Sequence, residues 1–124
     1  MRRIEILVCL LTVFTLLGNA EPFKLKELTC EYIENPLGID VYTPVLGWQL
    51  ESQARNQTQS AYEIQVSCEE GDLKDGKRLV WKSGRVNSPQ NINIVYSGKK
   101  LKPFTRYYWR VRVYNQDGEV SNWS

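Results

Sequence analysis

One stretch of sequence decides the fold of this chain: residues 105–124, TRYYWRVRVYNQDGEVSNWS. Its first half alternates between two sets of side chains, which is the period of a β-strand. One face of the strand would carry Tyr107, Trp109, Val111 and Val113, and the other would carry Tyr108, Arg110, Arg112 and Tyr114. The Asp117-Gly118 pair that follows is typical of a tight hairpin turn. The stretch therefore predicts a long strand, a turn and the start of a return.

The same alternation recurs upstream, whereas helical periodicity is absent from residue 21 onward. Clusters of Gly, Pro, Asn and Asp separate the alternating segments. The predicted strands are residues 25–32, 44–51, 61–68, 79–82, 91–96 and 104–115, and a polar loop is predicted at residues 69–77, EEGDLKDGK. Short strands at this spacing predict an all-β fold, an antiparallel sandwich.

Three aromatic residues indicate which kind of sandwich to expect, and all three are predicted to be structural. Tyr107 opens the long strand after a Pro-containing stretch, LKPFTRY, which fits a tyrosine corner whose phenol bonds to upstream backbone. Trp109 shares its apolar face, and Trp48 lies in the strand predicted at residues 44–51. No cysteine pair brackets a Trp as in a true immunoglobulin domain. We therefore expect a fibronectin type III-like member of the immunoglobulin-like sandwiches.

The end of the chain raises a question about the last strand. Only six residues follow Asp117-Gly118. A seven-stranded sandwich of this type needs a final strand beside residues 104–115, because an open apolar edge invites aggregation. The sequence therefore predicts that the last strand is missing or incomplete unless residues 119–124 pair with the long strand.

The N-terminus has the pattern of a secretory signal peptide. Arg2 and Arg3 precede an apolar run at residues 6–17, and Gly18-Asn19-Ala20 supplies the small residues of a cleavage site. A membrane anchor is the alternative, but the run is shorter than the roughly 20 residues that a spanning helix needs. We predict a signal peptide at residues 1–20, cleaved after Ala20, and a secreted or periplasmic sandwich at residues 21–124.

Charge and composition exclude several classes of function. The whole chain carries +2, and Arg2, Arg3 and Glu5 contribute +1 of this, so residues 21–124 carry +1. This balance gives no reason to expect a nucleic acid as a partner, or a membrane after signal cleavage. The chain contains no His, which removes the commonest general base and the commonest metal ligand.

Cys30 and Cys68 remain after the predicted cleavage, and export makes a disulfide between them possible. Both fall on the apolar phase of their predicted strands. We favour two buried, unpaired thiols, because a disulfide needs Cα atoms within roughly 7 Å of each other. Two thiols without His or a CxxC pair do not form a credible zinc site.

The acidic residues give no sign of catalysis. Hydrolysis of a glycosidic bond needs two carboxyl groups across one sugar, whereas the acidic residues here fall in loops or on outward strand positions. The densest group, Glu69, Glu70 and Asp72, lacks the ligand pattern of a calcium loop, so a solvated loop is favoured. No catalytic residue, metal ligand or cofactor is predicted.

Binding through aromatic side chains is the remaining possibility. The candidates for contact with a carbohydrate or a neighbouring domain are Trp81, Tyr108, Tyr114 and Trp123. An ordinary mixed sheet surface is favoured over a sugar site, since half-exposed aromatic residues are common on strands. The basic residues around them are interpreted as a solvated face rather than a nucleic-acid site.

Residues 29–52, TCEYIENPLGIDVYTPVLGWQLES, resemble the N-terminal fibronectin type III-like domain of bacterial α-L-rhamnosidases of glycoside hydrolase family 78. The resemblance continues through SAYEIQV and through residues 80–124, and so covers essentially all of residues 25–124. Residues 35–40 and 106–113 are its most specific parts.

The resemblance implies a non-catalytic accessory domain. In that family a large helical barrel carries the acidic residues that remove terminal α-linked rhamnose, and later domains of the same chain are the implied partners. Two alternatives stay open. One is a free-standing secreted module that binds an oligosaccharide or acts in adhesion. The other, less favoured, is a piece of a cytokine receptor, because SNWS resembles half of a Trp-Ser-x-Trp-Ser box and sequons occur at Asn56 and Asn122.

Overall fold

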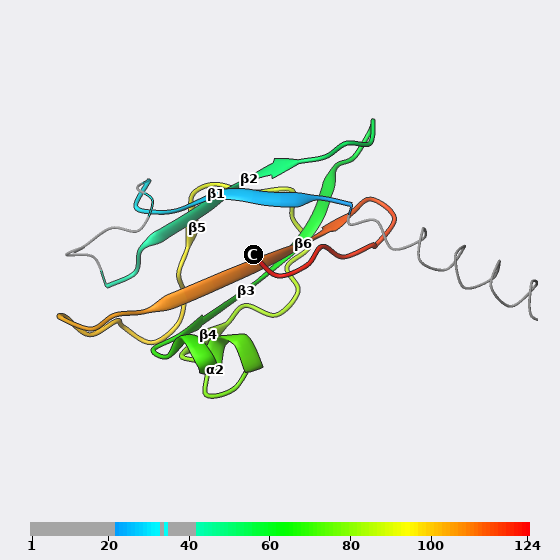
Figure 1. The fold of residues 1–124 in the computed structure, drawn as a ribbon. Coiled ribbons are helices and arrows are strands. Elements are labelled where there is room, and N and C mark those ends of the chain that lie inside the picture. Colours follow the sequence, from blue (N-terminus) through cyan, green and yellow to red (C-terminus); the bar gives the residue numbers. More distant parts are fainter. Residues whose placement is uncertain (1–21, 33, 35–41) are drawn as a thin grey trace, which may run out of the picture.

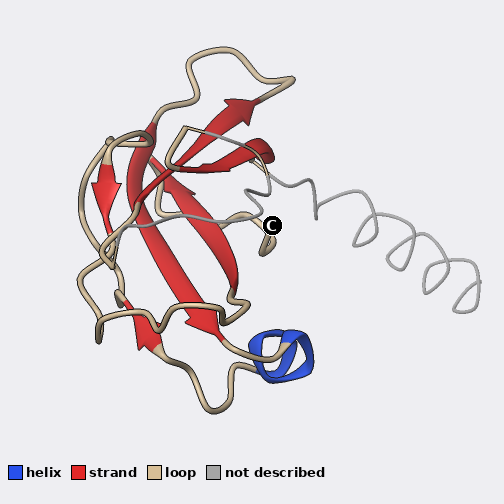
Figure 2. Ribbon diagram, turned by 90° about the vertical axis from the view of Figure 1, so that its left-hand side faces the viewer, coloured by secondary structure: helices blue, strands red, loops and turns tan. Residues whose placement is uncertain are grey.

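The computed structural model describes residues 22–32, 34 and 42–124, and the predicted signal peptide lies outside them. Two three-stranded antiparallel sheets pack face to face (Figures 1 and 2). In chain order the elements are β1 (Lys24–Cys30), β2 (Val45–Glu51), β3 (Gln59–Ser67), α2 (Glu70–Asp75), β4 (Trp81–Lys82), β5 (Ile94–Val95) and β6 (Tyr108–Asn115). The predicted immunoglobulin-like antiparallel sandwich is confirmed.

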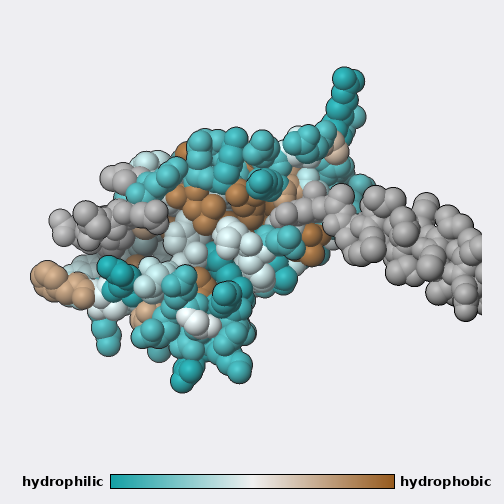
Figure 3. All heavy atoms as spheres, viewed as in Figure 1, coloured by the Kyte–Doolittle hydropathy of each residue, from teal (hydrophilic) through white to brown (hydrophobic). Residues whose placement is uncertain are grey.

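The strand order of the two sheets determines which edges meet the solvent. One sheet has the order β1-β2-β5 and the other has the order β4-β3-β6. The β3–β6 ladder is the longest, running from Gln59 opposite Asn115 to Ser67 opposite Tyr108. Figure 3 shows apolar surface between hydrophilic residues in the region of β1 and β2. Leu25 and Leu28 on β1 are half-buried and pack against the core.

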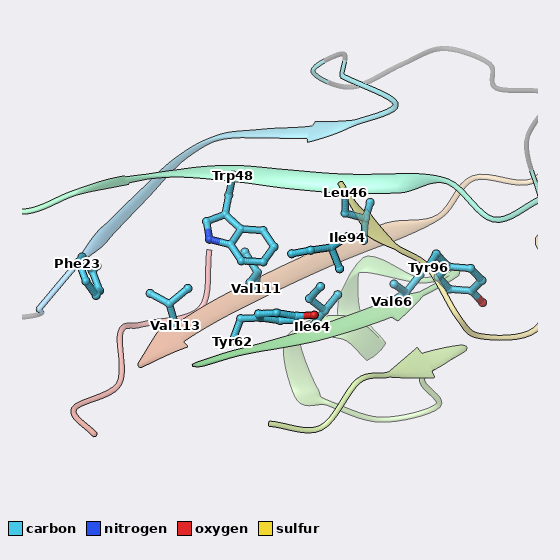
Figure 4. Close-up of a cluster of buried hydrophobic side chains, with 10 residues drawn as sticks. All are labelled: Phe23, Leu46, Trp48, Tyr62, Ile64, Val66, Ile94, Tyr96, Val111 and Val113. Atoms are coloured by element: carbon cyan, nitrogen blue, oxygen red, sulfur yellow. The ribbon is translucent and has the colours of Figure 1, made fainter. Parts of the chain in front are cut away.

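The core fills the space between the sheets, and Figure 4 shows side chains from both sheets pointing toward each other. Ile64 and Val111 are opposite each other on the neighbouring strands β3 and β6 and are fully buried, and Val113 is equally buried. Trp48 reaches across from β2 and packs edge-on against Tyr62, with ring centres 5.4 Å apart. Its indole N–H donates to the buried side chain of Gln59 at 3.2 Å, so this polar group is satisfied inside the core.

The predicted tyrosine corner is present. The Tyr107 hydroxyl accepts a hydrogen bond from the backbone N–H of Lys102 at 2.9 Å. Tyr107 and Trp109 pack against the core as the alternation predicts, and Trp48 is 3 % exposed. Trp48 thus lies inside the core and Tyr107 and Trp109 pack at its border, while their contribution to stability stays a prediction.

The predicted hairpin turn is confirmed, and it returns the chain along β6. Gly118 has φ +79°, a value that favours glycine. The buried Asn115 organises the turn, because its side-chain oxygen accepts from the N–H groups of Asp117 and Glu119 at 3.0 and 2.9 Å. Residues 119–124 then lie beside β6, where Ser121 and Ser124 donate backbone hydrogen bonds to the carbonyls of Val113 and Val111. The predicted open edge is thus covered along this part of β6.

Several details of the sequence interpretation are wrong. The predicted loop at residues 69–77 contains the short helix α2, which ends at Gly76 in the left-handed conformation (φ +67°). Three predicted strands are shorter by two or more residues in the structure, at Trp81–Lys82, Ile94–Val95 and Tyr108–Asn115. Ile92, within the strand predicted at residues 91–96, is 53 % exposed, because β5 begins only at Ile94.

The two cysteines are unpaired, as predicted, but they are not both buried. Cys30 is half-buried on β1, and burial, with a smaller contribution from the neighbouring Glu31 carboxylate, raises the pKa of its thiol. Cys68 is exposed, which corrects the prediction of a buried thiol. The reason is that β3 ends at Ser67, so the alternation that buries Ile64 and Val66 stops one residue too early. Within the described ranges no helix is long and apolar enough to cross a membrane.

Candidate functional site: the outer face of β6

The outer face of the β3–β6 ladder carries charged and aromatic side chains in cross-strand pairs. The register places Arg112 opposite Glu63 and Arg110 opposite Gln65. Because directly opposed side chains on one face of an antiparallel pair lie close together, each arginine meets its partner across the ladder. We call the set Glu63, Gln65, Arg85, Arg110, Arg112, Tyr114 and Trp123 the β6 outer cluster.

Glu63 forms the acidic centre of this cluster. One of its carboxylate oxygens, Oε1, accepts hydrogen bonds from Arg112 Nε at 2.8 Å and from the Tyr114 hydroxyl at 3.2 Å. Arg112 Nη2 forms an ion pair with the same oxygen at 2.7 Å. The Glu63 and Arg112 side chains are only 17 % and 31 % exposed, so this pair is better shielded from solvent than an ordinary surface ion pair.

Arg110 is held in the same way by an uncharged partner. Its Nε and Nη2 atoms both donate to Gln65 Oε1, at 2.9 and 2.7 Å. Burial, followed by repulsion from Arg112, lowers the pKa of Arg110, while Asp75 and Glu63 oppose this shift. An arginine remains charged at neutral pH even so, and both guanidinium groups therefore face the neighbouring ring as cations.

The indole ring of Trp123 contacts both guanidinium groups. The centre of the ring lies 4.3 Å from the Arg110 guanidinium carbon and 4.5 Å from that of Arg112. Arg85 stacks on Tyr114 in the same manner, at 4.2 Å. Each contact is a cation–π interaction that uses the ring face.

Two serine hydroxyls attach the return segment, residues 119–124, to the edge of β6. Ser121 Oγ accepts from the Val113 N–H and Ser124 Oγ accepts from the Val111 N–H, both at 3.0 Å. The hydroxyls take the place that carbonyl oxygens of a regular neighbouring strand would occupy. The backbone N–H groups of the same two serines donate in return to the carbonyls of Val113 and Val111, so residues 119–124 are held by backbone and side-chain hydrogen bonds together, which differs from an ordinary β-ladder.

The structure separates the four aromatic residues that the sequence proposed for binding. Tyr114 and Trp123 belong to the β6 outer cluster, and the half-buried Tyr108 begins β6. Trp81 lies on β4, packs against the core and contacts Tyr96 edge-on at 5.0 Å between ring centres. Contact of any of these four residues with a carbohydrate stays a prediction.

Sequence reasoning missed the residues that hold this surface together. Glu63 and Gln65 are only the polar residues that alternate with apolar ones in the strand predicted at residues 61–68, and Arg85 lies outside the predicted strands. The SxWS segment was the one usable signal, because it places two serines and a tryptophan at the end of the return. The cross-strand partners could not be assigned, because the pairing register joins residues about 50 positions apart, such as Glu63 and Arg112.

The described residues offer little for catalysis. No group of three or more His, Cys, Asp or Glu side chains is placed to hold a metal ion within the parts of the chain that the structure describes. A shallow hollow of about 250 Å³ lies between residues 22–24 and 51–53, and Glu51 is the one carboxylate among its lining residues. A single carboxylate does not supply the acid and base of glycoside hydrolysis.

The sandwich and its tyrosine corner define the class of protein, an immunoglobulin-like β-domain of the fibronectin type III kind. Residues 25–124 match the family described as "Rha78A-like, N-terminal immunoglobulin domain", and the chain belongs to that family. The sequence resemblance to the N-terminal domain of α-L-rhamnosidases is thereby confirmed.

The similar proteins are much longer than this chain. An α-L-rhamnosidase of Streptomyces avermitilis is 43 % identical over 101 residues, which are 82 % of this chain and 10 % of that protein. One of Formosa agariphila is 37 % identical over 90 residues, which are 73 % of this chain and 10 % of that protein. The chain thus spans about a tenth of these relatives and corresponds to their N-terminal accessory domain rather than to a whole enzyme.

Solved structures agree with this assignment. The structure of an α-L-rhamnosidase from Dictyoglumus thermophilum matches with a TM-score of 0.79 and 33 % identity, over 85 % of this chain and 12 % of that one. The S. avermitilis α-L-rhamnosidase, solved in complex with L-rhamnose, matches with a TM-score of 0.78 and 39 % identity, over 82 % and 10 % of the two chains.

Proposed function

We propose that this chain serves as the N-terminal accessory domain of an exported enzyme that removes terminal α-linked rhamnose. The observation that carries the proposal is the family match over residues 25–124, which occupies only about a tenth of each α-L-rhamnosidase relative. The domain's own contribution is structural. It packs against other domains of the parent chain and thereby stabilises the enzyme.

The build of the domain supports a packing role. Its long ladder is held on the inner side by buried apolar residues and on the outer side by the β6 outer cluster, so the sandwich presents a firm surface. Domains that stabilise a neighbour gain from such rigidity, because little conformational entropy is lost when two preformed surfaces join.

Export is part of the same proposal. The basic residues Arg2 and Arg3, the apolar run at residues 6–17 and the small residues before Glu21 are the parts of a signal peptide. Cleavage after Ala20 would release a secreted or periplasmic protein. Mass spectrometry of the exported chain checks this directly, because the expected N-terminal residue is Glu21 and an intact Met1 would contradict it.

A domain exchange tests the accessory role. Residues 25–124 of this chain would replace the matched segment of the S. avermitilis α-L-rhamnosidase, and a second variant of that enzyme would lack the segment altogether. We expect the exchange to restore the soluble yield and melting temperature that the deletion loses. We also expect an unchanged turnover of a rhamnoside by the folded fraction.

Trp48→Ala within the exchanged domain is the control, because it removes a buried indole that joins the two sheets. This variant should behave like the deletion. An exchange protein that is no more stable than the deletion variant would contradict the accessory role.

A further inference from the structure

The loop between β5 and β6, residues 96–107, lies at one end of the sandwich and exposes both an aromatic ring and several basic side chains. Figure 1 shows it protruding at the end where β6 begins. Phe104 in this loop has a fully exposed side chain, with a relative exposure of 109 %. An exposed phenyl ring leaves apolar area in water that burial would remove, at roughly 25 cal/mol per Å².

The backbone at Phe104 is unusual as well, with φ +55°. A residue with a β-carbon seldom adopts this left-handed conformation, which costs roughly 1–2 kcal/mol. The loop is nevertheless fixed on both sides of Phe104. The Lys102 N–H donates to the Tyr107 hydroxyl at 2.9 Å, and the Thr105 hydroxyl donates to the Pro103 carbonyl at 3.1 Å. Phe104 is one of seven described residues other than glycine with a positive φ, and what distinguishes it is that the tyrosine corner holds its fully exposed ring in this conformation.

Four basic side chains lie in the same loop as Phe104. The loop contains the exposed side chains of Lys99, Lys100, Lys102 and Arg106. No acidic residue occurs anywhere between Asp75 and Asp117 in the sequence. Tyr42 provides a second exposed ring near this loop. Its carbonyl accepts a hydrogen bond from the Leu101 N–H at 3.4 Å, and the Lys100 ammonium lies 5.7 Å from its ring centre.

The direction of the return segment points to the same end of the molecule. Residues 119–124 run antiparallel to β6, and Ser124 has come level with Val111. The segment therefore runs toward the start of β6, where the loop lies. The relatives place about nine tenths of their length outside the matched region. A neighbouring domain of such a parent would be close to this end.

We propose that Tyr42, Lys100, Lys102, Phe104 and Arg106 form the docking surface for the adjacent domain of the parent enzyme. This rests on the proposed function. The partner surface is an apolar socket that accepts the Phe104 ring, with acidic side chains around it that meet the lysines and the arginine. Docking removes the exposed ring from water. Because the tyrosine corner has already set the conformation of the loop, little conformational entropy is lost when the interface forms.

Cleavage by trypsin tests the surface, because the loop contains its own cleavage sites. We would compare the rates of cleavage after Lys100 and Arg106 in the free chain and in the S. avermitilis exchange protein, using mass spectrometry. Docking is expected to slow both cleavages by about tenfold or more, since an ordered and covered loop opens rarely. Cleavage after the exposed Arg55 is the internal control and should stay within about twofold, because the β2–β3 loop lies at the other end of the β3–β6 ladder.

Substitution of Phe104 gives a second readout with opposite signs in the two proteins. Phe104→Gly should raise the melting temperature of the free chain, because glycine adopts a positive φ without strain. In the exchange protein the same change should restore rapid cleavage at Arg106. Ile92→Gly is the matched control, since Ile92 is also exposed but lies outside the loop, and it should leave protection of the loop intact.

The failures of the two proposals can be told apart. An exchange protein that is stable and active, but whose loop is cut as fast as in the free chain, would overturn the docking surface and leave the accessory role standing. An unstable exchange protein would contradict the accessory role itself. Vesicles of phosphatidylcholine and phosphatidylglycerol provide a third arm. Protection of the loop by these vesicles alone, with none in the exchange protein, would overturn domain docking in favour of an anionic lipid surface.

Discussion

The two faces of β6 are stabilised in different ways. On the inner face Val111 and Val113 are completely buried against the other sheet. On the outer face Arg110 and Arg112 are partly exposed, and Trp123 from the return segment contacts both of them. One strand of eight residues thus faces a dry apolar core on one side and a stacked polar surface on the other.

This difference shows how a small sandwich can stabilise an edge strand. The inner face gains free energy from removing apolar area from water, which does not depend on exact orientation. The outer face depends on orientation, because the indole must lie against guanidinium groups whose positions Glu63 and Gln65 fix by hydrogen bonds. We therefore expect truncation of the inner face to cost more than truncation of the outer face.

The largest effect is expected at the inner face. Val113→Ala should lower the free energy of unfolding by about 2–3 kcal/mol, because two buried methyl groups are lost and a cavity remains. Urea denaturation measures this. Val95→Ala is the control, since Val95 is 54 % exposed on β5 and should cost less than about 1 kcal/mol. Equal losses for the two variants would contradict the burial argument.

A smaller effect is expected at the outer face. Trp123→Ala should cost about 1–2 kcal/mol, because it removes contacts with two guanidinium groups, each worth roughly 0.5–1 kcal/mol at a partly exposed site. Trp123→Phe retains a ring and should lose less than half of this. Urea denaturation of both variants decides the matter. If Phe and Ala prove equally destabilising, the ring–cation contact is not what attaches the return segment.

The smallest effect is expected from alkaline pH, and it reports on the core between the two sheets. Burial raises the pKa of the hydroxyls of Tyr62 and Tyr96. The unfolded chain loses these protons first, near pH 10, so stability is fully present below that pH and falls as pH rises through the raised folded-state pKa. Tyr62→Phe should make this fall less steep in urea titrations between pH 9 and about 11. A fall identical to that of the unchanged chain would contradict this origin.

Local pattern in the sequence was enough for the class of fold and for its fixed points. The alternation at residues 107–114 correctly divided β6 into an apolar and a polar face, because successive side chains of a strand must point to opposite sides. Asp117-Gly118 gave the turn and Tyr107 gave the corner, since both depend on residues close together in the chain. Where a strand stopped early, the pattern failed. Cys68 continues the apolar alternation in the sequence, but it lies one residue beyond the end of β3 and is exposed.

The composition of the candidate surface was decided only by the tertiary structure. Nothing local to Glu63 indicates that its carboxylate holds both Arg112 and Tyr114, because those partners come from a strand about 50 residues away and meet it through the register of a long ladder. The contact of Trp123 with two arginines likewise requires the return segment, residues 119–124, to lie on β6, as does the use of two serine hydroxyls in place of backbone acceptors. The sequence by itself determined which side chains face outward. The folded chain decided which of them meet, because contacts between distant residues are set by strand pairing and packing.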